Sequence, residues 1–554
     1  MSLDPKAADG GLAARGPEWT PVSRILAAAA VVLALYLYLG RLDGTPLQRG
    51  NEAMYASPPA MMLENGDYLV PLYRGQHFLD KPILPFWVVA ASYKLLGVSV
   101  FAERLPTALA GLATALLLGL WIRRRAGSFA GFLAGILLLF SFLYVFIGMT
   151  FAADAFLTFA LLAASILLDR ATRSDGSDAL WGGLSGAALA VAFGFKGLVG
   201  IVLPCGAVAA TLLADRRWPR RFWRRAAWAL VVLVAILGPY HWAMDRRLGM
   251  EFWDVFYWKN QFLRGASRIY MRGHRGALYY VGVLGWGLFP WSFPLLASFA
   301  RRKPSSLPLG AFLFGLAFWS PLIMKREVYA VTLLPAAVAL VAESVGAPRP
   351  GARALWPRVL WTLAAALAIG MVGFWVWARP LLTGPAGSGV TLFLGVSLFL
   401  LAAAVVGCAA RPRSAAALLG AALACGVVNL SARLADEKVG RFDPLPAWGE
   451  RARAECRTGG CDGFVYGEDV TSLEFYSGFD WAPVIDPGRE IPAMMTHGKA
   501  FVVVKSRLEP LLDELPYRWE VLERCPTYGS YSMDQFIGSG RGSETLLSLV
   551  RIER

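Results

Sequence analysis

Apolar and polar stretches alternate along most of the chain. About thirteen apolar runs approach the roughly 20 residues that an α-helix needs to cross the hydrocarbon core of a bilayer. They lie near residues 25–40, 104–122, 128–148, 150–168, 180–195, 197–214, 226–244, 278–299, 306–323, 328–344, 355–378, 390–410 and 414–430. The pattern predicts a polytopic α-helical membrane protein whose transmembrane domain covers residues 25–430.

The loops between these runs differ in charge. When the N-terminal tail, residues 1–24, is placed in the cytoplasm, each loop predicted on the same side is basic. The basic clusters lie at 123–125, 170–173, 216–225, 301–303, 349–358 and 411–413. Because cytoplasmic loops of membrane proteins carry an excess of Lys and Arg, the pattern predicts a cytoplasmic N-terminus. The remaining loops, and the chain after about residue 430, are then predicted outside the cytoplasm.

Composition supports this class of protein. The chain has 554 residues, of which 56% are hydrophobic and only 17% are charged, as in polytopic membrane proteins. A net charge of +15 could indicate a nucleic-acid partner. The arginines, however, flank apolar runs instead of forming one basic stripe, so we expect no nucleic-acid binding.

Two of the outer segments, 50–100 and 245–277, are long and half apolar. In the second, Phe252, Trp253 and Phe256 recur at helical spacing with charges between them, which predicts an amphipathic helix in the membrane interface. The first segment carries several carboxylates and Lys81 among aromatic residues and prolines. A transport protein rarely needs such a loop after its first helix, whereas an enzyme working at the membrane surface does.

The last part of the chain, 431–554, changes character. Its apolar runs shorten to GFVYG, WAPVID, AFVVVKS and WEVLER, which are typical of strands in length and β-branched content. We expect a small α/β domain on the periplasmic side. Cys456 and Cys461 lie close together in the sequence, and an exported domain permits a disulfide between them.

Ionisable side chains near membrane depth are candidates for function, because burying them there is unfavourable. For each alone a structural explanation exists, since a lysine at a helix end can snorkel and an aspartate can cap a helix. As a set they point to one site at the outer face, where cations suit a phosphate and carboxylates suit proton removal or metal binding. The set comprises Glu52, Asp80, Lys81, Asp154, Lys196, His274 and Lys325.

Short motifs in a fixed order resemble the GT-C membrane glycosyltransferases. The resemblance is strongest to the branch that contains the aminoarabinose transferases of lipid A and the bacterial relatives of protein O-mannosyltransferases. It covers residues 25 to about 345. The motifs are NEAMYA at 51–56, GDYLVP at 66–71, DKP at 80–82, FAERLP at 101–106, Asp154, KG at 196–197, HR at 274–275, PW at 290–291 and KRE at 325–327.

The resemblance implies a GT-C fold of about thirteen helices with interfacial helices and a periplasmic domain. It implies a polyprenyl-phosphate-linked sugar donor and transfer with inversion. The phosphate-contact candidates are Lys81, Lys196, Arg275 and Lys325. Tyr55 would either stack on a sugar face or belong to an aromatic belt at the membrane interface. A divalent metal ion (Zn, Mg or Mn) would be held between Asp80 and His274.

The sequence departs from the family pattern at two places. Asn51 stands where relatives carry the favoured catalytic acid, and an amide cannot remove a proton. Either Glu52 or Asp154 acts as the base, or no strong base is needed because the acceptor is an ionised phosphate. Pro58 and Pro59 predict that the interfacial helix starts late or is broken, because proline disrupts a helix interior.

The sequence thus predicts a bacterial inner-membrane glycosyltransferase, acting as a monomer on a glycolipid, glycan or protein acceptor in the envelope. No nucleotide cofactor is expected, since no phosphate-binding glycine motif stands between a strand and a helix. Two alternatives stay open. A transporter or flippase would show internal repeats and polar groups at the bilayer midplane. A non-catalytic envelope scaffold would explain Asn51 as lost activity.

Overall fold

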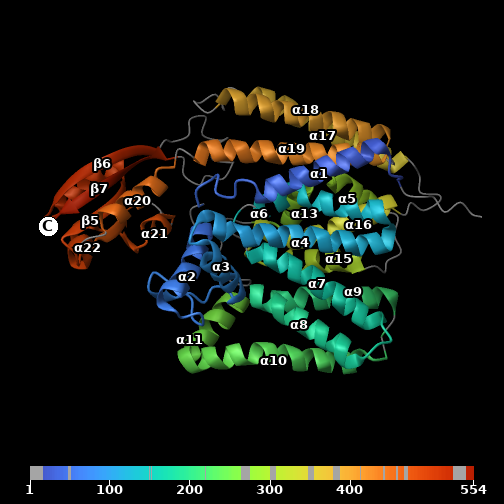
Figure 1. Cartoon of the computed structure of the whole chain (residues 1–554), viewed down its shortest axis with the longest axis horizontal. Coiled ribbons are helices and arrows are strands. Elements are labelled where there is room, and N and C mark those ends of the chain that lie inside the picture. Colours follow the sequence, from blue (N-terminus) through green and yellow to red (C-terminus); the bar gives the residue numbers. More distant parts are fainter. Residues whose placement is uncertain are drawn as a thin grey trace, which may run out of the picture.

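The computed structural model describes residues 17–47, 51–148, 150, 153–216, 218, 220–263, 275–299, 307–346, 355–378, 387–411, 414–440, 443–456, 460–466, 472–527 and 545–553. Long helices form a bundle, and a smaller domain of mixed helices and strands lies at one end of it (Figure 1).

Each of the apolar runs in the sequence coincides with a helix or with two consecutive helices. The bundle consists of α1 (Pro21–Leu39), α4 (Val100–Ala126), α5 (Ser128–Leu139), α6 (Phe142–Gly148), α7 (Ala153–Arg173), α8 (Asp178–Lys196), α9 (Val199–Asp215), α10 (Phe222–Leu248), α13 (Tyr279–Gly287), α14 (Ser292–Phe299), α15 (Leu307–Trp319), the 3₁₀-helix η4 (Glu327–Leu333), α16 (Leu334–Gly346), α17 (Leu355–Ala378), α18 (Gly387–Ala410) and α19 (Ala415–Gly440).

Length and composition mark many of these helices as membrane spans. In the described part of the chain, seven helices are long and apolar enough to cross a bilayer, or up to nine if each bent pair is one span. The bent pairs are α5 with α6, at 63°, and α13 with α14, at 119°. Shorter apolar helices include α9, α15 and parts of α17 and α18. The chain is therefore a multi-pass membrane protein, and the number of about thirteen crossings stays a prediction.

Among the described residues, the basic ends of α4 and α7 and the basic start of α10 lie at one end of the bundle. Arg125 at the end of α4 forms an ion pair of 2.7 Å with Glu343 of α16, and Arg225 of α10 forms one of 2.9 Å with Asp178 of α8. The C-terminal domain lies at the opposite end, together with α2 and α11 (Figure 1). The charge asymmetry in the sequence is thus also an asymmetry in space, and its orientation to the cytoplasm stays a prediction.

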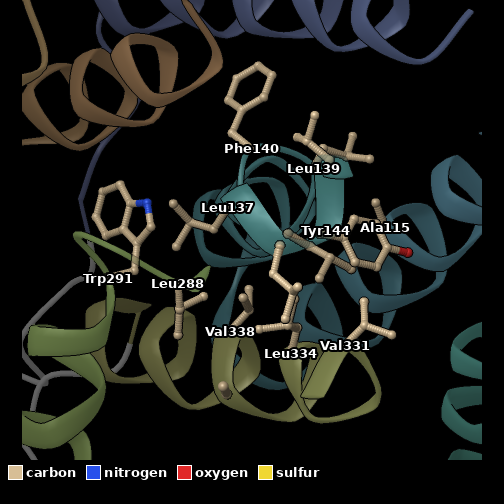
Figure 2. Close-up of a cluster of buried hydrophobic side chains, with 14 of the residues drawn as sticks. Ala115, Leu137, Leu139, Phe140, Tyr144, Leu288, Trp291, Val331, Leu334 and Val338 are labelled. Atoms are coloured by element: carbon tan, nitrogen blue, oxygen red, sulfur yellow. The ribbon is translucent and has the colours of Figure 1, made fainter. Parts of the chain in front are cut away.

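The centre of the bundle is a buried apolar core. Side chains from α5 and α6 face those of η4 and α16, and the turn between α13 and α14 closes one side (Figure 2). The labelled members are Ala115, Leu137, Leu139, Phe140, Tyr144, Leu288, Trp291, Val331, Leu334 and Val338. All of them are buried, so this packing fixes η4 rigidly at the centre of the bundle.

Short elements cover the end of the bundle near the C-terminal domain. They are α2 (Asn51–Asn65), the hairpin of β1 (Leu72–Tyr73) and β2 (Gln76–His77), α3 (Leu84–Leu96), α11 (Met250–Phe252) and the π-helix η2 (Trp253–Leu263). The amphipathic character expected for 245–277 is present, since Phe252 and Phe256 are buried while Trp258 and Phe262 are exposed. Residues 264–274 lie outside the described part.

The expectation of a late or broken helix at Pro58 and Pro59 is wrong. Helix α2 runs through both prolines from Asn51 to Asn65. Both are buried, and the helix packs between α3 and the C-terminal domain, with Ala53 and Ala56 against Leu47 and Phe475. Tertiary packing on two sides therefore offsets the two backbone hydrogen bonds that the prolines remove.

The C-terminal domain contains a mixed sheet in the order β4-β3-β5-β7-β6. Strands β3 to β5 are parallel, and β7 is antiparallel to β5 and β6. The four expected strands are present, and β7 is an additional one. The elements are α20 (Leu445–Glu455), β3 (Asp462–Tyr466), α21 (Ser472–Ser477), β4 (Trp481–Val484), α22 (Pro487–Met494), β5 (Lys499–Lys505), η6 (Ser506–Glu514), β6 (Arg518–Thr527) and β7 (Thr545–Glu553).

Two features define how this domain begins. Helix α19 continues to Gly440, beyond the boundary expected at residue 430, and the separate domain starts with α20. Cys456 and Cys461 form the expected disulfide.

Helix α10 packs onto α8 through glycines. A Cβ atom on Gly186 would lie 2.2 Å from the carbonyl oxygen of Ala229, whereas one on Gly183 would meet Val232 at an ordinary 3.6 Å. We expect Gly186→Ala to destabilise the protein by about 1–3 kcal/mol through overpacking. Gly183→Ala should be neutral or slightly stabilising, because alanine favours a helix. Thermal unfolding of both variants in detergent checks this, and equal stability of the two would contradict it.

Candidate active site

A buried ion pair anchors the segment that follows α1. The carboxylate of Glu52 accepts two hydrogen bonds from the guanidinium of Arg104, of 2.7 and 2.9 Å. Arg104 also donates to the carbonyl oxygens of Leu42, Thr45 and Pro46, at 2.8–2.9 Å. Arg104 and Glu52 are only 1% and 3% exposed. A carboxylate held in this way is suited to positioning α2, and its predicted role as a base gains no geometric support.

One helical turn beyond Glu52, Tyr55 reaches the DKP motif. Its hydroxyl donates to Asp80 at 3.1 Å, and the ammonium of Lys81 pairs with the same carboxylate oxygen at 2.9 Å. The ammonium of Lys81 also lies 5.4 Å from the centre of the Tyr55 ring. Lys81 is therefore oriented from two sides. The ring of Tyr55 is buried against this lysine, so the geometry favours an orienting role over stacking on a sugar.

A second lysine–aspartate pair joins α7 and α8. Asp154 lies in the first turn of α7 and Lys196 ends α8, and their side chains form an ion pair in which each is only 11% exposed. The ammonium of Lys196 lies 4.3 Å from the centre of the Tyr329 ring and 5.9 Å from that of Trp319. Two aromatic rings thus line one side of the pair, and the charge of Lys196 is poorly solvated there.

The remaining cations lie at the start of α13 and before η4. Arg275 binds the Tyr279 hydroxyl at 2.6 Å, the carbonyl oxygen of Lys325 at 2.7 Å and Glu327 at 3.0 Å. Lys325 itself donates to the carbonyl of Leu322 at 2.6 Å. Glu327 and Tyr329 both lie on η4, so this 3₁₀-helix connects the Arg275 network to the Lys196 pair.

The structure therefore pairs most of the predicted residues with an oppositely charged side chain: Glu52 with Arg104, Asp80 with Lys81, Asp154 with Lys196 and Arg275 with Glu327. The partners Arg104, Trp319, Tyr329, Tyr279 and Glu327 were not predicted, although Arg104, Glu327 and Tyr329 lie in or beside recognised motifs. The opposite charges of residues within those motifs were the signal from which some of these partners could have been predicted.

Two predicted residues cannot be placed in this arrangement. His274 lies outside the described residues, and so does the side chain of Asn51, whose backbone starts α2. Within the described ranges no group of three or more His, Cys, Asp or Glu side chains could hold a metal ion. Asp80 is bound to the ammonium of Lys81, which competes with a cation. The described residues do not form a metal site on their own, and the metal site expected between Asp80 and His274 stays a prediction.

Comparisons with known proteins place the chain among enzymes. The family model described as dolichyl-phosphate-mannose-protein mannosyltransferase matches residues 80–242, a segment that contains both lysine–aspartate pairs. An undecaprenyl phosphate-α-4-amino-4-deoxy-L-arabinose arabinosyl transferase from Pectobacterium carotovorum is 29% identical over 395 residues, which cover 67% of this chain and 69% of the relative. A protein of the same description from Edwardsiella ictaluri is 31% identical, but over only 47% of either chain.

The fold is similar to that of a solved structure over nearly the whole chain. The crystal structure of ArnT from Cupriavidus metallidurans bound to undecaprenyl phosphate superimposes with a TM-score of 0.73, covering 96% of this chain and 98% of that one at 21% identity. This chain has the fold of the GT-C membrane glycosyltransferases and is similar in sequence to their aminoarabinose transferases.

The C-terminal domain of this glycosyltransferase contacts the segment between α1 and α3, which contributes Tyr55, Asp80 and Lys81 to the candidate site. Glu474 of α21 forms an ion pair with Arg74 of the β1–β2 hairpin, and the backbone N–H of Leu47 donates to the hydroxyl of Tyr476 at 3.0 Å. Burial raises the pKa of Glu474 to about 7, although Arg74 acts in the opposite direction. The ion pair therefore only partly offsets the desolvation of this carboxylate.

This raised pKa makes the domain contact sensitive to pH. The folded protein holds a proton on Glu474 up to a pH near 7, whereas the unfolded chain releases it near 4.5. The stabilisation is complete below the lower value and is lost as the pH rises through the higher one. Raising the pH from about 5 to 8 should therefore lower the stability of wild type, by the order of 3 kcal/mol.

Glu474→Gln should remove most of this pH dependence, because the amide does not titrate. The exposed Glu450 in α20 offers a matched control, and Glu450→Gln should behave as wild type. Thermal unfolding in detergent across this pH range is the measurement. An unchanged pH profile in Glu474→Gln would show that this carboxylate does not control the contact.

Proposed function

We propose that this glycosyltransferase moves a sugar from a polyprenyl-phosphate donor to a phosphate-bearing glycolipid of the lipid A type at the periplasmic face of the bacterial inner membrane. The observation that carries the proposal is the presence of two lysine–aspartate pairs at linked outer segments, Lys81 with Asp80 and Lys196 with Asp154. The names of the curated relatives, and the undecaprenyl phosphate bound to the similar ArnT, support the same donor class.

The leaving group explains the two cations. When the bond between the sugar carbon and the donor oxygen breaks, negative charge develops on the polyprenyl phosphate. Preorganised ammonium groups with little access to water stabilise such charge far more than groups in bulk water do. Lys81 and Lys196 are 16% and 11% exposed, which fits this requirement.

The nature of the acceptor is inferred from the lack of an available general base among the candidate residues. Asn51 cannot remove a proton, Glu52 is held by Arg104, and Asp154 is held by Lys196. A phosphate oxygen is already ionised at neutral pH and can attack the sugar carbon directly, with inversion. The new carbon–oxygen bond forms as the bond to the donor phosphate breaks, and no proton needs to move. An acceptor phosphate therefore fits these residues better than a hydroxyl group does.

The orientation completes the proposal. The described basic loops lie at the end of the bundle opposite the C-terminal domain, which supports a cytoplasmic N-terminus and a periplasmic C-terminal domain.

Mass spectrometry of membrane lipids tests this function directly. Lipid extracts from cells with and without the protein are compared, and the expected difference is the loss of a single sugar from a phosphorylated glycolipid. Accumulation of the unused polyprenyl-phosphate sugar should accompany that loss. Unchanged glycolipids with an altered sidedness of the donor lipid would instead indicate a flippase.

The two lysines should contribute to donor binding and turnover. We expect Lys81→Met and Lys196→Met each to lower kcat/KM by an amount that corresponds to about 2–5 kcal/mol, because each removes one partly buried cation from the phosphate. Lys94 is an exposed lysine on α3, and Lys94→Met should be as active as wild type. The measurement is kcat/KM of the purified variants. Full activity of Lys81→Met or of Lys196→Met would exclude that lysine from the phosphate site.

A further inference from the structure

The π-helix η2 lies between the two segments that carry the paired lysines. Its Phe256 packs in one apolar cluster with Leu79, which precedes Asp80, and with Phe193, one turn before Lys196. The rings of Phe193 and Phe256 lie 6.3 Å apart. π-helical turns are rare and occur frequently at functional sites. The apolar contacts therefore place one unusual helix against both lysine-bearing segments.

Two consecutive amides on η2 make the polar contacts. The side-chain amide of Asn260 donates to the carbonyl oxygen of Leu79 at 3.4 Å and to that of Val255, on its own helix, at 2.8 Å. Leu79 directly precedes Asp80 and Lys81 in the chain. Asn260 thus ties η2 to the backbone that presents the first lysine.

Gln261 makes the corresponding contact on the other side. Its carbonyl oxygen accepts a hydrogen bond of 3.1 Å from the backbone N–H of Leu198, at the start of α9. This N–H belongs to the helix start, where no backbone partner is available within the helix. Between Lys196 and Leu198, Gly197 has a φ of +70°, and a Cβ atom there would lie 2.3 Å from the Gln261 carbonyl oxygen. The amide therefore fits closely against the turn that follows the second lysine.

We propose that Asn260 and Gln261 are positioning residues that fix the separation between Lys81 and Lys196, so that both ammonium groups meet one donor phosphate. The inference rests on the proposed function, because it assumes that the two lysines bind that phosphate. Neither amide is placed on the substrate. Each acts through the backbone of a lysine-bearing segment, and a shift of either segment would separate the two cations.

The chemistry of the two contacts differs in a way that a matched pair of substitutions can detect. Asn260 must donate a hydrogen bond to a carbonyl, and Gln261 must accept one from an N–H. A carboxylate can accept but cannot donate. The same amide-to-acid change should therefore break the contact at residue 260 and preserve it at residue 261.

The test compares Asn260→Asp, Gln261→Glu and Gln261→Met in the full-length protein in detergent. Binding of undecaprenyl phosphate and transfer from an undecaprenyl-phosphate-linked aminopentose to lipid A are measured. We expect Asn260→Asp and Gln261→Met to weaken binding and lower kcat/KM about 10- to 100-fold, since small displacements of binding groups have effects of this size. Gln261→Glu should stay within about threefold of wild type.

Lys259→Gln serves as the control on the same helix, because Lys259 is about half exposed and pairs with Asp254 on η2. It should bind and transfer as wild type does.

Thermal unfolding of each variant accompanies the kinetics. Loss of activity in Asn260→Asp only together with loss of folded protein would overturn the inference, as would equal effects of the acid at both positions. If Lys81→Met and Lys196→Met are inactive while the acids show no asymmetry, this inference fails and the proposed function survives. If the lysine variants are fully active, the proposed function fails first.

Discussion

The arrangement of the segments between α1 and α4 depends on the burial of one guanidinium. Arg104 lies at the start of α4, and its hydrogen bonds reach Glu52 of α2 and three backbone carbonyls after α1. A charge removed from water is tolerated only when its donors are satisfied, and removing one partner of such a pair is strongly destabilising. The chain after α1 is therefore obliged to fold around Arg104. This places α2 over the end of the bundle, and Tyr55 on α2 then orients the Asp80–Lys81 pair.

The same rule governs the lysines. Lys81 and Lys196 each keep a carboxylate partner, and each also lies over an aromatic ring, Tyr55 or Tyr329. These partners hold the ammonium groups in place with little water around them. A phosphate that enters such a site meets oriented cations and does not have to reorganise solvent. The rigid core beneath η4 keeps Tyr329 fixed, so the packing shown in Figure 2 contributes indirectly to the position of Lys196.

The sequence predicted the elements well and their partners poorly. Helices were found because an apolar run of spanning length is a local signal. The strands β3 to β6 were found because their β-branched runs are local too. Helix α2 was predicted to break at Pro58 and Pro59, and only its packing against distant residues such as Phe475 explains its continuity. Contacts such as Lys196 with Asp154, or Gln261 with Leu198, join residues far apart in one chain, and no local pattern indicates such pairing.

The site residues illustrate the same division. The residue types were predicted from the motifs, and their outer location, inferred from the arginine pattern, stays a prediction. The ion-pair partners of the carboxylates were not predicted. Glu52 was a candidate base in the sequence, and the structure shows it bound twice by Arg104. Asp154 is likewise occupied by Lys196. With Asn51 at the first position, and with Glu52 and Asp154 each bound to a cation, these residues are better suited to stabilising a negative charge on a phosphate than to removing a proton. In such an enzyme the distance between two cations matters more than the pKa of a base, which gives the η2 contacts to both lysine-bearing segments a physical reason.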